Sequence, residues 1–143
     1  MTRINIGIKP SELCDQHLVA EYRELPRAFA YKGRTLAGPF RLNAGHVIWC
    51  SQWPGTLAER YRSLVSELAY RGFTVNHPEP RGDGAHAPAH RLVGAREIVC
   101  ERILERLANM ETQPRWTKRS PPKWTLPALE LRKLSCQQTF QNA

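Results

Sequence analysis

Hydrophobic residues repeat at helical spacing in three segments of the chain. In the first segment the apolar positions follow one another at intervals of four, three and four residues: Leu18, Tyr22, Leu25 and Phe29. This pattern predicts a helix with one buried face, and either Ser11 or Asp15 is the expected N-cap because short polar side chains cap helices well. Pro26 should kink or end this helix, since proline lacks the backbone donor and its ring crowds the preceding turn.

The second helix is predicted after the turn at Trp53-Pro54-Gly55. Thr56 and Glu59 have the spacing of a capping box, and Gly72 is the expected C-terminal stop. The apolar residues in this segment repeat at helical spacing: Leu57, Tyr61, Leu64, Val65 and Leu68. The preceding run at 45–50 is short, apolar and partly β-branched, so we expect a buried extended stretch there.

The third helix is predicted from about Ala89 to Asn109, after an irregular connection rich in proline and glycine. Its apolar residues share one face: Leu92, Ile98, Val99, Ile103, Leu104 and Leu107. Its arginines should point largely outward: Arg91, Arg96, Arg102 and Arg106. Three main helices with little strand content predict an all-α fold, a compact single domain with an N-terminal arm and an irregular C-terminal tail.

The tail after Glu111 differs in composition from the rest of the chain. Its prolines preclude a long helix: Pro114, Pro121, Pro122 and Pro127. Between them basic residues are mixed with Trp116 and Trp124. Because 143 residues suffice for one modest core, we expect a folded domain over residues 1–123 and a flexible extension over residues 124–143.

The composition also bears on the cellular setting. No stretch approaches the ~18 to 20 uninterrupted apolar residues of a membrane-spanning helix, and the N-terminus lacks the pattern of a secretory signal. We therefore expect a cytoplasmic protein with no membrane partner. The cysteines lie far apart in sequence, without zinc spacing: Cys14, Cys50, Cys100 and Cys136. Reduced thiols and no bound metal are the expected consequences.

Net charge is the first indication of a partner. The chain carries +8 at pH 7, from 21 basic and 13 acidic residues, and most of the basic residues are arginine. Such a surface attracts polyanions, and the guanidinium group suits bidentate contacts to phosphate. The charge favours nucleic acid only weakly, because many proteins carry a basic surface.

The polar face of the first predicted helix carries His17, Arg23, Glu24 and Arg27. Taken alone, this cluster is typical of a solvated helix face with ordinary ion pairs. The blocks around it are more specific: Thr2-Arg3-Ile4-Asn5-Ile6, Ser11-Glu12-Leu13, Asp15-Gln16-His17-Leu18 and residues 20–27. Looser matches follow at Ala44-Gly45-His46-Val47, Arg71-Gly72-Phe73 and Pro114-x-Trp116-x-Lys118. On these blocks the chain resembles the pyrimidine-dimer DNA glycosylase and AP lyase family, the endonuclease V of phages.

The resemblance implies a covalent mechanism. After removal of Met1, the amine of Thr2 would attack C1′ of the damaged nucleotide, displace the base and leave an imine. Glu24 would stabilise the positive charge on the sugar and assist removal of the C2′ proton, so that β-elimination breaks the strand. An α-amine has a reference pKa of roughly 7.7 to 8, and nearby arginines would lower it further, so no cofactor is needed.

The resemblance also implies the substrate, damaged double-stranded DNA containing a cyclobutane pyrimidine dimer. The residues that would contact this DNA are Arg3, Gln16, His17, Arg23, Arg27, Arg102, Arg106, Trp116 and Lys118. Unpairing beside a lesion costs less than at normal pairs, so the deformability of the duplex is read. We expect a monomer with no obligate protein partner. Two alternatives remain: the same mechanism on another damaged or modified base, and a basic DNA- or RNA-binding protein without catalysis.

Overall fold

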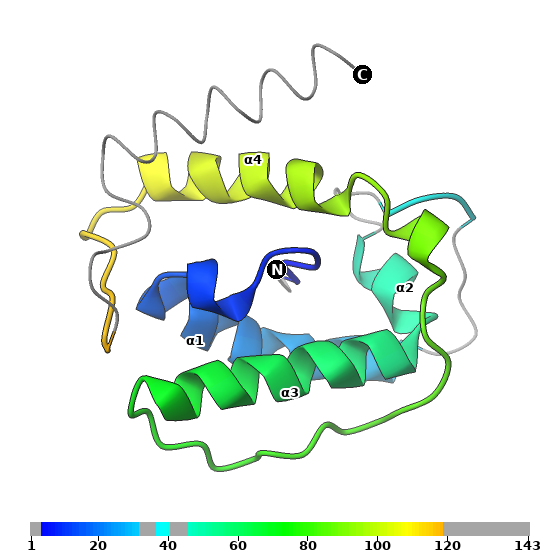
Figure 1. The fold of residues 1–143 in the computed structure, drawn as a ribbon, viewed down its shortest axis with the longest axis horizontal. Helices are drawn as coiled ribbons and strands as arrows, with labels where there is room; N and C mark the ends of the chain where they lie inside the picture. Colours follow the sequence, from blue (N-terminus) through cyan, green and yellow to red (C-terminus); the bar gives the residue numbers. More distant parts are fainter. Residues whose placement is uncertain (1–3, 32–36, 41–45, 119–143) are drawn as a thin grey trace.

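A computed structural model describes residues 4–31, 37–40 and 46–118 of the chain, and all regular structure within these ranges is helical (Figure 1). The elements in chain order are the 3-10 helix η1 (Pro10–Glu12), α1 (Asp15–Glu24), the 3-10 helix η2 (Leu25–Ala30), α2 (His46–Ser51), α3 (Pro54–Tyr70), the 3-10 helix η4 (Ala89–Arg91) and α4 (Ala95–Ala108). The predicted all-α fold with three main helices is confirmed, with α1, α3 and α4 as those helices. None of the described helices is both long and apolar enough to span a membrane.

The described part of the N-terminal arm, residues 4–8, runs through the interior between α3 and α4 (Figure 1). Ile4, Ile6 and Ile8 are all buried. From α3, Arg60 donates a hydrogen bond to the Ile8 carbonyl, and from α4, Arg96 donates one to the carbonyl of Gly7. The arm is therefore a structural layer of the core, not a loose end.

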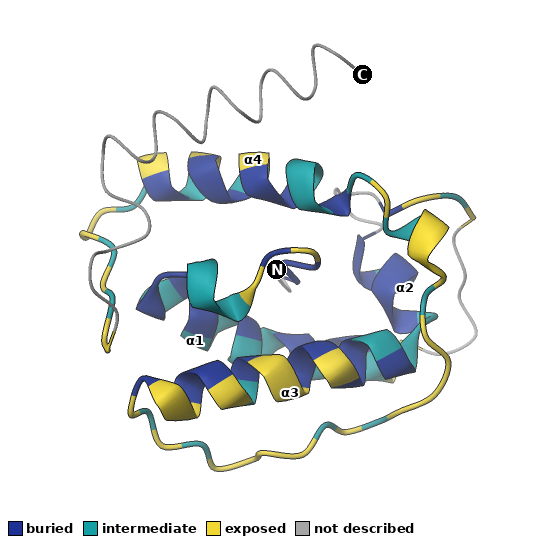
Figure 2. Ribbon diagram, in the orientation of Figure 1, coloured by how far each residue is buried: buried dark blue, intermediate teal, exposed yellow. Residues whose placement is uncertain are grey.

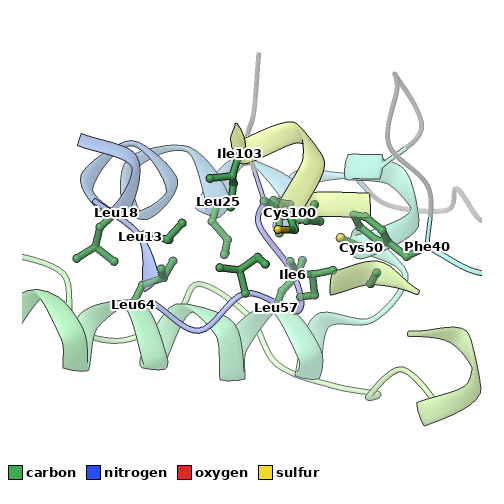
Figure 3. Packing of buried hydrophobic residues seen from close by; sticks show 14 of the residues in the cluster. Ile6, Leu13, Leu18, Leu25, Phe40, Cys50, Leu57, Leu64, Cys100 and Ile103 are labelled. Carbon is green, nitrogen blue, oxygen red and sulfur yellow. The ribbon is translucent and has the colours of Figure 1, made fainter. Parts of the chain in front are cut away.

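The apolar core is built around this arm. Ile6 meets Leu57 of α3 and Cys100 of α4, and Leu13 and Leu25 extend the cluster along α1 (Figure 3). The buried sides of α3 and α4 both face inward toward the arm, and their exposed sides face outward (Figure 2). Burial of an isoleucine or leucine side chain contributes about 1.5–3 kcal/mol, so the arm supplies a substantial share of the stability of this small domain.

The first helix begins and ends for different reasons. It ends at Glu24 and continues as η2, as predicted from Pro26. The predicted N-cap was wrong, because the capping position is Cys14 and no side chain caps the helix. Asp15 instead directs its carboxylate to Arg71 and Thr117, and Ser11 lies within η1. Partners distant in sequence thus compete successfully with the local cap.

The run at 45–50 is helical where the structure describes it, so the predicted extended stretch was wrong. Residues 46–51 form α2, and all of them except Ile48 are buried. A short segment buried on every side has no hydrophobic periodicity that separates helix from strand. The Trp49 indole donates a 2.9 Å hydrogen bond to the carbonyl of Gly38 and anchors the helix.

The ends of α3 differ in how well they were predicted. The helix starts at Pro54, ahead of the predicted capping box, and Thr56 accepts a 2.7 Å hydrogen bond from the backbone of Ala87 instead. Proline suits the first helical position because the missing N–H would have no intrahelical acceptor there. The predicted stop at Gly72 is confirmed: its φ is +91°, and the Phe73 N–H bonds to the Leu68 carbonyl.

The third predicted helix is interrupted. Residues 89–91 form the short η4, Gly94 adopts a left-handed conformation with φ +83°, and α4 starts only at Ala95. The start at about Ala89 was therefore wrong, and the end near Asn109 was right to within one residue. The glycine breaks the helix because the left-handed conformation turns the chain out of the helical path.

The connection from residue 71 to residue 88 returns along the outer side of α3 (Figure 1). Two stacked tyrosines, Tyr22 and Tyr61, hold it by hydrogen bonds from their hydroxyls to the carbonyl of His77. Burial of the hydroxyl is the largest cause that raises the pKa of Tyr61, and the interaction with the neighbouring Tyr22 raises it further, to about 12. Tyr61 therefore remains a protonated donor throughout the physiological pH range.

Candidate functional site

A buried ion pair fixes the N-terminal arm to the helices. Arg60 of α3 makes a bidentate contact with Glu21 of α1, through Nε to Oε2 at 2.8 Å and Nη2 to Oε1 at 2.9 Å. The Asn5 amide of the arm donates a 2.9 Å hydrogen bond to the same carboxylate, at Oε1. The exposed fractions of these three residues are 8%, 0% and 1%. The arm, α1 and α3 are thus joined by charge-assisted hydrogen bonds sheltered from water.

Glu24 is the last residue of α1 and lies three residues after Glu21. Residues three apart occupy the same side of a helix, and the rise between them is about 4.5 Å. The side chain of Glu24 is half-buried, and its Oε2 is shielded from solvent without a hydrogen-bond partner among the described residues. One turn along α1 from the carboxylate that binds the arm there is thus a second carboxylate oxygen with unused accepting capacity. Thr2 and Arg3 lie outside the described residues.

Arg23 and Arg27 flank Glu24 in sequence, and both are exposed. They are four residues apart, on α1 and η2 respectively. Their guanidinium groups are available to solvent beside a half-buried carboxylate. A contact of either arginine with phosphate stays a prediction.

Two other residues of α1 that were predicted to contact DNA are instead buried or bonded to another part of the protein. His17 is buried, with 6% of its surface exposed. The side-chain amide of Gln16 donates to the Gln113 carbonyl at 2.8 Å and accepts from the Arg115 N–H at 3.0 Å. In the structure Gln16 therefore holds the tail, and a contact of either residue with DNA stays a prediction.

The tail docks on the start of α1 through a second buried cluster around Arg71. This fully buried guanidinium bonds to Asp15 and Glu67 at 2.9 Å each and to the Leu13 carbonyl at 2.6 Å. Thr117 hydrogen-bonds to the Asp15 carboxylate through its N–H and its hydroxyl. The half-buried ring of Trp116 lies 5.7 Å from the Arg71 guanidinium carbon, at cation–π distance. Trp116 thus packs within the protein, whereas Lys118 at the end of the described tail is exposed.

Both arginines predicted to contact DNA on α4 are half-buried. Arg106 donates from Nη1 to the Asn5 Oδ1 at 3.3 Å, so this side of α4 faces the arm. Arg102 lies one turn earlier on the same side. Glu101 and Glu105 are exposed and occupy a different side of the helix. A contact of this side of α4 with the phosphate backbone stays a prediction.

The described residues hold no group of three or more His, Cys, Asp or Glu side chains placed to bind a metal ion. Cys14, Cys50 and Cys100 are buried free thiols. Burial raises the pKa of the Cys14 and Cys50 thiols, so both stay protonated at physiological pH.

The sequence signals for this site were uneven. The two buried arginine clusters, at Arg60 and Arg71, were not predicted as structural centres, although Arg71 stands in one of the motifs that carry the family resemblance.

The chain was compared with models of known protein families. The family model described as pyrimidine dimer DNA glycosylase matches residues 1–80. The match covers the arm, α1, α2 and α3, and therefore includes Glu24 and both buried clusters' arginines.

Proposed function

Because this chain belongs to the pyrimidine dimer DNA glycosylase family, we propose that it excises cyclobutane pyrimidine dimers from double-stranded DNA and cuts the strand as an AP lyase. The amine of Thr2, exposed by removal of Met1, acts as the nucleophile, and Glu24 acts as the catalytic carboxylate. The observation that carries the proposal is the Oε2 of Glu24, which has no hydrogen-bond partner among the described residues and lies one helical turn along α1 from the Glu21 that binds the arm.

Chain geometry supports the pairing of Thr2 with Glu24. Asn5 is bonded to Glu21, and Thr2 precedes Asn5 by three residues. Three residues span at most about 11 Å, whereas Glu24 lies only about 4.5 Å further along the helix axis than Glu21. The terminal amine is therefore tethered within reach of the Glu24 carboxylate.

The proposed chemistry balances without a cofactor. The neutral amine forms a bond to C1′ as the glycosidic bond to one pyrimidine breaks, and the departing base takes up the proton that the new ammonium group loses. The C1′–O4′ bond then breaks, O4′ takes up a proton from water, and an iminium ion links the enzyme to the opened sugar. Glu24 stabilises the positive charge and then accepts a proton from C2′. The electrons of this C–H bond form a C2′=C3′ double bond, which is conjugated with the imine at C1′, while the C3′–O bond breaks and the phosphate leaves. Water finally hydrolyses the imine and regenerates the amine.

Arginines of α1, η2 and α4 supply the contacts with the duplex. Arg23 and Arg27 lie on either side of Glu24, and Arg102 and Arg106 present a second basic edge on α4. These contacts fix the register of the protein on the phosphate backbone and carry no sequence preference. Selectivity for damage then comes from the low cost of unpairing and bending the duplex at a lesion.

Borohydride trapping tests the proposal directly. The purified protein is mixed with a duplex that carries one cyclobutane thymine dimer, with an abasic duplex and with undamaged DNA. We expect a covalent adduct on the first two substrates only, and its loss when the N-terminal amine is blocked by acetylation. An adduct on abasic DNA alone would move the activity to another lesion, and no adduct on either would leave a non-catalytic binding protein.

The phosphate contacts can be tested by the dependence of affinity on salt. Arg23→Gln and Arg27→Gln should each reduce the slope of log Kd against log salt concentration by about 1, because each variant releases about one counterion fewer. Arg62→Gln is the control, since Arg62 lies on the outer side of α3, 3.6 Å from Asp83. Equal slopes for all four proteins would place the DNA on another face.

A further inference from the structure

We infer that Asn5 is a positioning residue: it fixes the direction in which the arm leaves the core and thereby holds the Thr2 amine at Glu24. The inference rests on the proposed function and assigns a role to a buried residue that does not touch the reacting atoms. The two ends of the Asn5 side-chain amide bond to two different helices, α1 and α4.

Both polar atoms of the Asn5 side chain are engaged. Nδ2 donates to Glu21 Oε1 of α1 at 2.9 Å, and Oδ1 accepts from Arg106 Nη1 of α4 at 3.3 Å. The residue is 1% exposed, so neither bond competes with water. Hydrogen bonds depend steeply on angle, and two of them to separate helices define the rotation of the arm as well as its position.

Glu21 does not need Asn5 to be satisfied. Its two carboxylate oxygens already accept from Nε and Nη2 of Arg60, at 2.8 and 2.9 Å. Loss of the Asn5 amide would leave this ion pair intact. The contribution of Asn5 is therefore separable from the contribution of the pair that stabilises the fold.

The neighbouring arm residues cannot replace this directional role. Ile4 and Ile6 are buried on either side of Asn5 and hold the arm by apolar contact. Such contact is non-directional, so it fixes the depth of the arm in the core better than its rotation. A buried amide adds little net stability, and its presence between two isoleucines is explained by orientation.

Orientation matters here because the reacting atom is close along the chain. Thr2 is three residues from Asn5, so a small rotation at Asn5 is amplified over a lever of up to about 11 Å. A misplacement of about 1 Å between reacting groups lowers a rate by about 10²-fold. The amine would still be present and nucleophilic, but it would spend less time at C1′.

The test compares Asn5→Leu and Asn5→Ala with the wild type and with Thr56→Val. Leucine keeps the apolar volume and alanine avoids overpacking, so at least one variant should fold. Thr56→Val removes one hydrogen bond, which the Thr56 hydroxyl accepts from the Ala87 N–H at the start of α3, and controls for lost stability. Single-turnover trapping on abasic duplex gives the rate, DNA titration gives Kd, and ¹⁵N relaxation reports the order of residues 4–6.

For the Asn5 variants we expect the trapping rate to fall about 10- to 100-fold, with Kd within about threefold and lower order parameters in the arm. Thr56→Val should match the wild type in all three measurements. An unchanged rate in the Asn5 variants, or the same loss in Thr56→Val, would overturn the inference while leaving the proposed function intact. A wild type that forms no adduct would instead overturn the proposed function, and the positioning role with it.

Discussion

Replacing Glu24 with glutamine should lower the rate of strand cleavage by about 10²- to 10⁴-fold, the range observed for loss of a positioned acid–base group. The amide keeps the shape of the half-buried side chain and can still accept a hydrogen bond. It has no negative charge to stabilise the developing cation, and it is too weak a base to take the C2′ proton. Affinity for damaged duplex should stay within about threefold, because the phosphate contacts are made by other residues.

Single-turnover cleavage of a duplex with one thymine dimer measures this effect, and binding is measured separately by titration. Glu101→Gln is the matched control, because it removes the same charge from an exposed position on α4. The control should cleave at the rate of the wild type. Full cleavage by Glu24→Gln would show that the carboxylate is structural and that another group takes the proton.

Replacing Arg60 with methionine should lower the free energy of unfolding by about 3–5 kcal/mol. The change leaves the Glu21 carboxylate buried at 0% exposure with only the Asn5 amide as a partner among the described contacts, and it removes the donor to the Ile8 carbonyl. A buried charge without its counter-ion is far more costly than the loss of the pair as a whole. The arm should therefore loosen as the protein becomes less stable.

Urea unfolding followed by circular dichroism measures the stability change. Arg62→Gln on the same helix is the control and should change stability by less than about 1 kcal/mol, because its pair with Asp83 is exposed. The double variant Arg60→Met with Glu21→Leu should recover most of the loss, since it removes both charges. If the single and double variants were equally unstable, the cause would be lost packing and not an uncompensated charge.

Local sequence signals predicted the ends of helices correctly where the backbone of a single residue determines the end. Pro26 ends α1 and Gly72 ends α3, because each acts through its own backbone. The caps at Asp15 and Thr56 were predicted wrongly, since both side chains bond to residues that are distant in sequence. The buried helix α2 was missed because a segment without a solvent face has no periodicity to read.

The residues of the candidate site also divide into those that local sequence predicts and those that depend on contacts distant in sequence. Arg23, Glu24 and Arg27 follow from the sequence as a polar helix face, and the structure leaves both arginines exposed. Gln16 and Trp116 are residue types that often contact ligands at a surface. In the structure, however, Gln16 bonds to the backbone of the tail and Trp116 packs against Arg71. The burial of a polar side chain depends on what packs over it, and a single sequence does not contain that information.

The position of the arm between α3 and α4 also sets an order of events during synthesis. The arm leaves the ribosome before α4, which covers it and is made roughly ninety residues later. Arg60 and Arg106 reach the arm only after their own segments have emerged, so its contacts are among the most non-local in the chain and slow to form. The residues at the start of the arm therefore stay outside a folded core until α4 has been made and packs over the arm. In that interval an aminopeptidase can remove Met1, so that the proposed nucleophile is exposed before the domain that uses it is complete.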